Sequence, residues 1–203
     1  MVYRIILVLS FLTSSLVTLS GQIEDLSYFT SQLNDARTSK NFERLALAYY
    51  EIGIFEEEKN RNSEKSFEYL SRALEYYEFL NDTIGEYTTR YHIASHLLKN
   101  NMYDDALNEF KQLKSYFNRT QNDKYSALVE LALFSLELQD LNIDAAKNAL
   151  DLARVYLDTL NNSELEIDYL IDQIQYYEYV QELDTALVLA NYCFELSQKS
   201  SDQ

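Results

Sequence analysis

Proline and tryptophan are absent from this chain of 203 residues, and glycine occurs only three times. Proline and glycine are the residues that most readily interrupt or end a helix, so their scarcity favours long helices. Hydrophobic residues make up 47% of the chain, which is enough to bury a core. Long segments of Leu, Ala, Glu, Lys and Tyr separate the few polar junctions. The composition therefore predicts a folded, all-α protein.

Several functional classes lack the residues that they need. A single cysteine, Cys193, excludes an internal disulfide, and no Cys-x-x-Cys or Gly-x-Ser-x-Gly motif occurs. The three glycines also leave little material for a loop that cradles phosphate. Basic residues number 17 against 33 acidic ones, and the resulting formal charge of −16 repels nucleic acid and anionic lipid. We therefore expect no catalysis, no cofactor and no nucleic acid partner.

Histidine is equally scarce, since the chain holds only His92 and His96. They stand four residues apart on a predicted helix, a spacing that can hold a divalent metal. Two ligands are too few, and the intervening Ile-Ala-Ser lacks the glutamate of the His-Glu-x-x-His metalloprotease motif. A nearby acid could supply a third ligand. We favour a packing or surface role and predict no metal site.

Residues 1–20 have the layout of a secretory signal peptide, with one charge at Arg4, an apolar run from Ile5 to Leu12, and a small, polar stretch through Ser20. The mature chain would then begin at Gly21 or Gln22. We expect an exported protein, periplasmic or secreted, with no membrane insertion of the mature chain.

The alternative is an uncleaved membrane anchor. Ser10 and the cluster Thr13 to Ser15 argue against it, because they interrupt a stretch already short for spanning a bilayer.

A pattern with a step of 40 residues organises the rest of the chain. A small residue recurs at Ser66, Ala106, Ala146 and Ala186. Four residues later stand Leu70, Phe110, Leu150 and Ala190. Seven residues later stand Ala73, Leu113, Ala153 and Cys193. These offsets share one helix face, and a period of this size marks an array of helical repeats.

Helices are expected as four pairs near 41–80, 83–118, 123–160 and 163–198, after a leading half-repeat at 23–37. Capping boxes of the Ser/Thr-x-x-Glu type place helix starts at Thr83 and Ser163, and Asp123 is an N-cap in the same register. No linker rich in proline or glycine divides the chain. We therefore expect one continuous domain over residues 21–203.

The pair formed by 87–99 and 103–117 resembles a tetratricopeptide repeat, with Ala94, Ala106 and Phe110 at three signature packing positions. The period exceeds that family's usual length of about 34 residues, and the closing proline is missing. The extended repeats of kinesin light chains are the nearer comparison. The resemblance implies a right-handed α-solenoid of antiparallel helix pairs. It also implies a non-catalytic scaffold that binds a protein or peptide on its concave face.

The tetratricopeptide register places three rows of residues on the concave face, one row member from each first helix. The rows are Glu51, Tyr91, Leu131 and Ile171; Phe55, Ser95, Ser135 and Gln175; and Lys59, Lys99, Gln139 and Tyr179. From these rows the candidate peptide-binding residues are Glu51, Phe55, Lys59, Tyr91, Ser95, Lys99, Gln139, Gln175 and Tyr179. The mixture of aromatic, amide, hydroxyl and charged groups suits an extended peptide.

Two further alternatives stay open. A signal peptide ahead of such repeats also resembles the extracytoplasmic sensor half of some histidine kinases and related transcriptional regulators. Asn81, Asn118 and Asn161 each satisfy the Asn-x-Ser/Thr rule for glycosylation, although turns and caps also use these residues. The sequence identifies neither the ligand nor the oligomeric state.

Overall fold

A computed structural model describes residues 26–59 and 63–201. Over these residues the structure consists of α-helices joined by turns, without strands, which confirms the all-α class. Contacts between Cα atoms divide the chain into two compact units, residues 1–96 (unit 1) and 97–203 (unit 2), and each is described by itself. The predicted signal peptide lies outside the described residues, and the single domain stays a prediction.

None of the helices in the described ranges combines the length and apolar character needed to cross a membrane.

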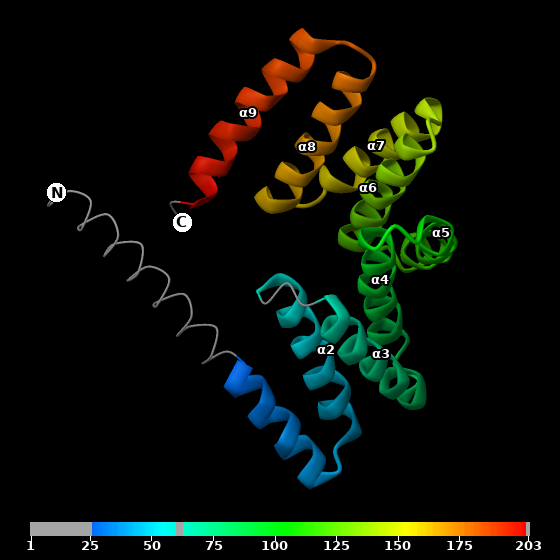
Figure 1. Cartoon of the computed structure of the whole chain (residues 1–203), viewed down its shortest axis with the longest axis vertical. Coiled ribbons are helices and arrows are strands. Elements are labelled where there is room, and N and C mark those ends of the chain that lie inside the picture. The colour runs from blue at the N-terminus through cyan, green and yellow to red at the C-terminus, as the bar shows by residue number, and fades with distance from the viewer. Residues whose placement is uncertain (1–25, 60–62, 202–203) are drawn as a thin grey trace, which may run out of the picture. The chain divides into compact units, whose positions relative to one another are not determined.

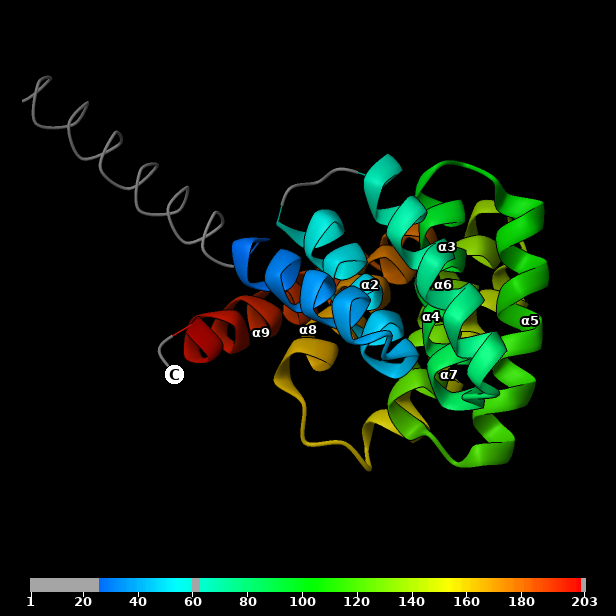
Figure 2. The same ribbon diagram turned by 90° about the horizontal axis from the view of Figure 1, so that it is seen from below.

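Unit 1 contains a helical segment at 26–39, α2 (Phe42–Glu58), α3 (Ser63–Leu80) and most of α4 (Thr83–Lys99). The helices α2 and α3 pack against each other as an antiparallel pair (Figure 1), and Figure 2 shows the same pair from a second direction. Side chains three and four residues apart share a helix face, so each helix contributes a stripe to the core. The core residues are Leu33, Ala36, Leu45, Ala46, Ala48, Tyr49, Ile52, Ala73 and Tyr77.

Unit 2 contains α5 (Tyr103–Thr120), α6 (Asp123–Gln139), α7 (Ile143–Leu157), α8 (Ser163–Tyr179) and α9 (Leu183–Ser201). Two antiparallel pairs, α6 with α7 and α8 with α9, have the most extensive contacts, and α5 also packs on α6 and α7 on α8. The first helices of the two pairs, α6 and α8, contact each other as well.

The recurring small residues lie in the cores of the units. Ser66, Ala106 and Ala146 are fully buried, and Ala186 is 5% exposed. The positions four and seven residues later are buried in α3, α5 and α7, whereas Ala190 and Cys193 in α9 are only half-buried. Packing around the last helix is therefore thinner than around its counterparts.

Most of the described turns between helices share one geometry that uses no glycine, and the turn from α7 to α8 is an exception. A residue with a left-handed backbone, φ between 52° and 65°, follows the helix at Lys40, Asn81, Asn101, Gln121, Leu141 and Gln181. The next amide then donates to the carbonyl five residues back, as Asn142 N does to Glu137 O at 2.9 Å. This is the Schellman arrangement, which satisfies carbonyls at the helix end. It ends one helix and starts the next within three residues.

The helices α4, α6 and α8 begin at residues 83, 123 and 163, as predicted, but their capping residues differ from the predicted ones. Asp82, Asn122 and Asn162 are the N-caps, each accepting a backbone N–H with its side-chain oxygen, rather than Thr83, Asp123 and Ser163. Asp82 and Asn122 directly follow the left-handed residues Asn81 and Gln121, which places their side chains next to the first turn of the next helix. Glu86 and Glu166, the expected partners in the capping boxes, pair with Arg90 and Arg154.

Leu141 tests the cost of this geometry, because its side chain is 66% exposed while its backbone is left-handed. The left-handed region costs a non-glycine residue about 1–2 kcal/mol. We expect Leu141→Gly to raise the free energy of unfolding by about 1 kcal/mol, since glycine removes that strain. Thermal and urea unfolding followed by circular dichroism measure the change.

The matched control is Leu47→Gly, an exposed leucine inside α2. There the same substitution should lower stability by about 1 kcal/mol, as glycine does within helices. A loss of stability at both positions would contradict the assignment of strain to Leu141.

Candidate functional site

The predicted groove residues of unit 1 divide into surface and core positions. Glu51, Tyr91 and Ser95 are half-buried and Lys59 is exposed. Phe55 is only 6% exposed, and its ring centre lies 5.7 Å from that of Phe29. The prediction that Phe55 lines an open groove is therefore wrong, because the helical segment 26–39 packs over this part of α2. Burial also raises the pKa of Glu51.

In unit 2 the predicted face is best displayed on α8. Tyr179 is 43% exposed, Gln175 is exposed, and their row companion Ile171 is 44% exposed. Lys99 and Gln139, at the ends of their helices, are exposed as well. Leu131 on α6 is buried at 7% and belongs to the core instead. The surface of α8 is consequently the part of the predicted groove that is most available to a partner.

Three carboxylates share this face of α8 and were missed at the level of the sequence. Glu164, Asp168 and Asp172 follow one another at intervals of four residues, so they lie along one side of the helix. Burial raises the pKa of Asp172 to about 7, and the neighbouring Asp168 carboxylate adds to the shift. The spacing of four residues is the signal in the sequence that could have found these carboxylates.

The two histidines are built into packing contacts of unit 1. His92 Nε2 lies 3.0 Å from the Tyr50 hydroxyl, and His96 Nδ1 lies 3.0 Å from Ser63 Oγ. The ring of His96 also stacks on Phe67 at 4.9 Å. Within the described residues, His, Cys, Asp and Glu side chains form no group of three that could hold a metal ion. The absence of metal chemistry stays a prediction.

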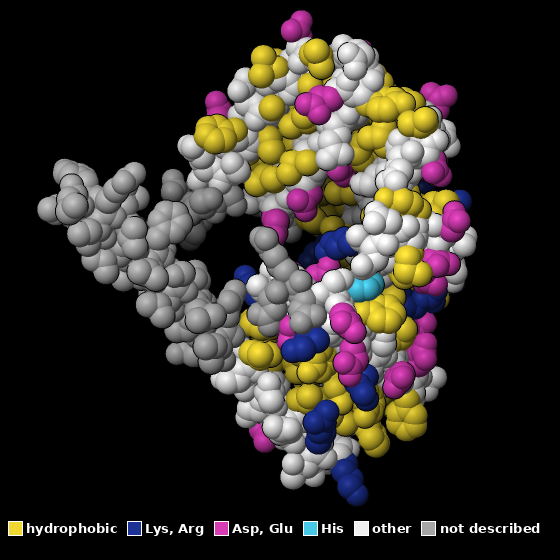
Figure 3. Space-filling view, viewed as in Figure 1, with side chains coloured by type: hydrophobic (Ala, Val, Ile, Leu, Met, Phe, Trp, Pro, Cys, Tyr) yellow, Lys and Arg dark blue, Asp and Glu magenta, His cyan; other side chains and the backbone are white. Residues whose placement is uncertain are grey.

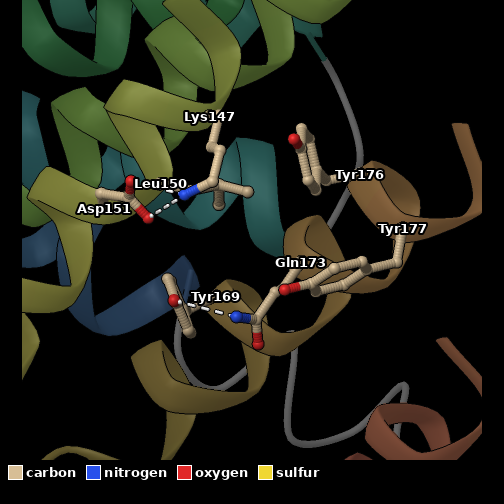
Figure 4. A pocket seen from close by; sticks show the side chains of 7 residues that line it. All are labelled: Lys147, Leu150, Asp151, Tyr169, Gln173, Tyr176 and Tyr177. Carbon is tan, nitrogen blue, oxygen red and sulfur yellow. Dashed lines mark hydrogen bonds and ion pairs between the residues drawn. The ribbon is translucent and has the colours of Figure 1, made fainter. Parts of the chain in front are cut away.

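A small polar hollow of about 20 Å³ lies between α7 and α8 (Figure 4). On the α7 side, Lys147 Nζ donates to both carboxylate oxygens of Asp151 at 2.6 and 2.9 Å, which raises the pKa of Lys147. On the α8 side, the Gln173 amide donates to the Tyr169 hydroxyl at 3.2 Å. The lining residues are Lys147, Leu150, Asp151, Tyr169, Gln173, Tyr176 and Tyr177.

The residues 40 positions earlier show that this polarity is not a general feature of the packing. Val129, Leu133 and Leu136 stand on α6 where α8 has Tyr169, Gln173 and Tyr176, and all three are at most 6% exposed. Pockets for small molecules usually occupy roughly 300–1,000 Å³, so the hollow is too small for a cofactor. It has room for about one water molecule.

Comparisons with known proteins identify the architecture. A scan against protein-family models gives no match, and a search of curated proteins finds no significantly similar sequence. Solved structures are similar, however. The chain superposes on a putative kinesin light chain with nearly identical TPR-like repeats from Podosopora anserina, with a TM-score of 0.63, 11% identity and 92% of both chains covered. The fold is tetratricopeptide-like.

Two other solved structures agree with this assignment. The apo form of RapI gives a TM-score of 0.67 at 20% identity over 93% of this chain, which spans 66% of the length of RapI. BtubC (BKLC) from P. vanneervenii gives 0.68 at 14% identity, covering 90% of this chain and 76% of BtubC. At these identities the likeness establishes the fold alone. Tetratricopeptide-like proteins are generally non-catalytic scaffolds that bind proteins or peptides.

The raised pKa of Asp172 predicts a dependence of stability on pH. The folded state holds this proton up to about pH 7, whereas the unfolded chain releases it near pH 3.8. The stability contributed by the protonated form is therefore present below about pH 4 and lost as the pH rises through about 7. Asp172→Asn should raise the free energy of unfolding at about pH 8 by about 1–2 kcal/mol, after allowing for solvent screening. At about pH 4 it should change little.

Urea unfolding at both pH values measures the effect. Glu164→Gln serves as the control, because it removes a charge from an exposed position on the same face. An equal stabilisation by both variants, or the same effect of Asp172→Asn at both pH values, would show that Asp172 is not desolvated.

Proposed function

We propose that the chain is an exported, non-catalytic scaffold of 40-residue helical repeats that binds a peptide or a flexible protein segment. The segment lies along the exposed faces of the first helices of the pairs. The tetratricopeptide-like fold supports the scaffold class. The single observation that supports this surface best is the exposed face of α8, where Ile171, Gln175 and Tyr179 stand four residues apart beside carboxylates.

The 40-residue repeat is supported by the turns. Helices α4 to α8 begin at residues 83, 103, 123, 143 and 163. Left-handed residues at Asn101 and Leu141 follow α4 and α6, the first helices of two successive pairs, at the same 40-residue interval. The pairs α4 with α5, α6 with α7 and α8 with α9 therefore reuse one local geometry, and the side chains at equivalent positions are the variable part of the scaffold.

The chemistry of the α8 face indicates the kind of segment. Ile171 and Tyr179 offer apolar contact, and the Gln175 amide can pair with a peptide backbone. Asp168 and Asp172 favour a lysine or arginine next to the apolar residue of the partner, and the formal charge of −16 attracts basic segments. A cation beside Asp172 would lower its raised pKa, so binding near neutral pH would release a proton.

A selection from a displayed library of random short peptides tests this function on the full chain. We expect enriched peptides to combine basic and apolar residues, and Tyr179→Ala to weaken the selected peptide about tenfold through loss of the aromatic contact. Tyr192→Ala is the matched control, since Tyr192 is an exposed tyrosine on α9. Equal weakening by the two variants, with both folded, would remove the α8 face from the proposal.

Export is tested separately by the mass of the secreted chain. Cleavage of residues 1–20 or 1–21 predicts a mature protein that begins at Gly21 or Gln22. Intact-mass spectrometry of the protein recovered outside the cytoplasm decides the question. A product that keeps Met1 and needs detergent would favour the anchor instead.

A further inference from the structure

The last helix, α9, carries an exposed apolar stripe. Leu183, Leu187 and Phe194 are 59%, 63% and 63% exposed. Ala190 lies between them and is half-buried. Their spacing of four, three and four residues places all of them on one side of the helix. Figure 3 shows hydrophobic side chains gathered over α8 and α9 on the face viewed there.

On α7 the same face is covered by α8. The residues 40 positions before Leu187, Ala190 and Phe194 are Lys147, Leu150 and Arg154. Lys147 and Leu150 line the hollow against α8, and Leu150 is 3% exposed. Arg154 Nη1 lies 2.8 Å from Oε1 of Glu166 on α8. This face of α7 therefore receives the first helix of the next pair.

The face of α5 is used in the same way. Phe110, which is equivalent to Leu150, is fully buried. Lys114, which is equivalent to Arg154, places its Nζ 2.8 Å from Oε1 of the buried Glu130 on α6. Both earlier helices thus bind a helix through a buried apolar residue and a cation that pairs with a carboxylate of that helix.

On α9 the cation is replaced by apolar side chains. Leu187 occupies the position of Lys147, and Phe194 occupies the position of Arg154 and Lys114. On α5 and α7 the cations pair with Glu130 of α6 and Glu166 of α8. A helix that packs against α9 would meet apolar side chains at these positions instead. The complementary surface is therefore an apolar helix stripe without the carboxylate.

Charge decides between a second copy and a different partner. Asp184 and Glu195, both exposed, follow Leu183 and Phe194 by one residue and so flank the stripe on its solvent side. A second copy of the chain would bring another formal charge of −16 to this surface. Lysine or arginine beside the partner's apolar stripe would instead pair with these two acids.

We propose that α9 binds an amphipathic helix of a partner protein, seated as α8 is on α7, with an apolar stripe bordered by lysine and arginine. The stripe buries its leucine and phenylalanine side chains against that helix, and Asp184 and Glu195 orient it. This site is separate from the peptide-binding face of α8 and does not depend on it.

A probe for this site can be built from α6, the helix that covers the equivalent face of α5. The probe is a labelled synthetic peptide of residues 122–140 with three changes, Glu130→Leu to meet Phe194 and Glu137→Lys and Asp140→Lys to supply positive charge. Fluorescence anisotropy with the full chain should show saturable binding. Phe194→Ser should weaken it about tenfold, because a central aromatic contact is lost. Tyr192→Ser, on another side of α9, should leave it unchanged.

Three results would overturn the proposal. The first is absence of saturable binding, and the second is equal weakening by Tyr192→Ser in variants whose circular dichroism is unchanged. The third is self-association of the full chain in sedimentation that Phe194→Ser abolishes, since a second copy would then cover the stripe. A peptide that keeps Glu137 and Asp140 should bind more weakly than the basic probe. Equal affinity would contradict the role given to Asp184 and Glu195.

Discussion

The left-handed residue that follows most of the helices is the constraint on which the rest of the structure depends. It lets the chain end one helix, cap the next and reverse direction within three residues, as at Gln121 and Asn122. Short turns of fixed geometry keep successive helices antiparallel, so the same helix face meets a neighbour in each pair. The polar groups of the turn are satisfied locally, and the side chains on the helix faces are left to determine binding.

Two kinds of surface follow from this repetition. One is the exposed face of the first helices, where α8 presents Ile171, Gln175 and Tyr179 next to a half-buried Asp172. The other is the face that each second helix offers to the next pair, which α5 and α7 use through Lys114 and Arg154. Positions 40 residues apart are structurally comparable. The polar side chains of α8 that line the hollow therefore differ clearly from the buried apolar side chains at the same positions of α6.

The sequence predicts the helices well because two signals agree, the scarcity of breakers and the 40-residue step of small residues such as Ala106 and Ala146. It misplaces the N-caps by one residue, since Asn122 and Asp123 are both good caps and only the left-handed turn decides between them. The tetratricopeptide register assigns Phe55 to the groove, because the spacing of one row does not show that Phe29 packs against it. The raised pKa of Asp172 depends on how deeply its carboxylate is buried, and this cannot be predicted from the sequence.

The central claim is that α8 presents the binding face of a scaffold, and site-specific photo-crosslinking tests it most directly. A benzophenone amino acid placed at position 175 of the full chain, on the exposed face of α8, should crosslink to a bound peptide selected by display. The same group at position 192, exposed on α9, should not. Crosslinking from position 192 alone, with no product from 175, would show that the peptide binds elsewhere and would contradict the account.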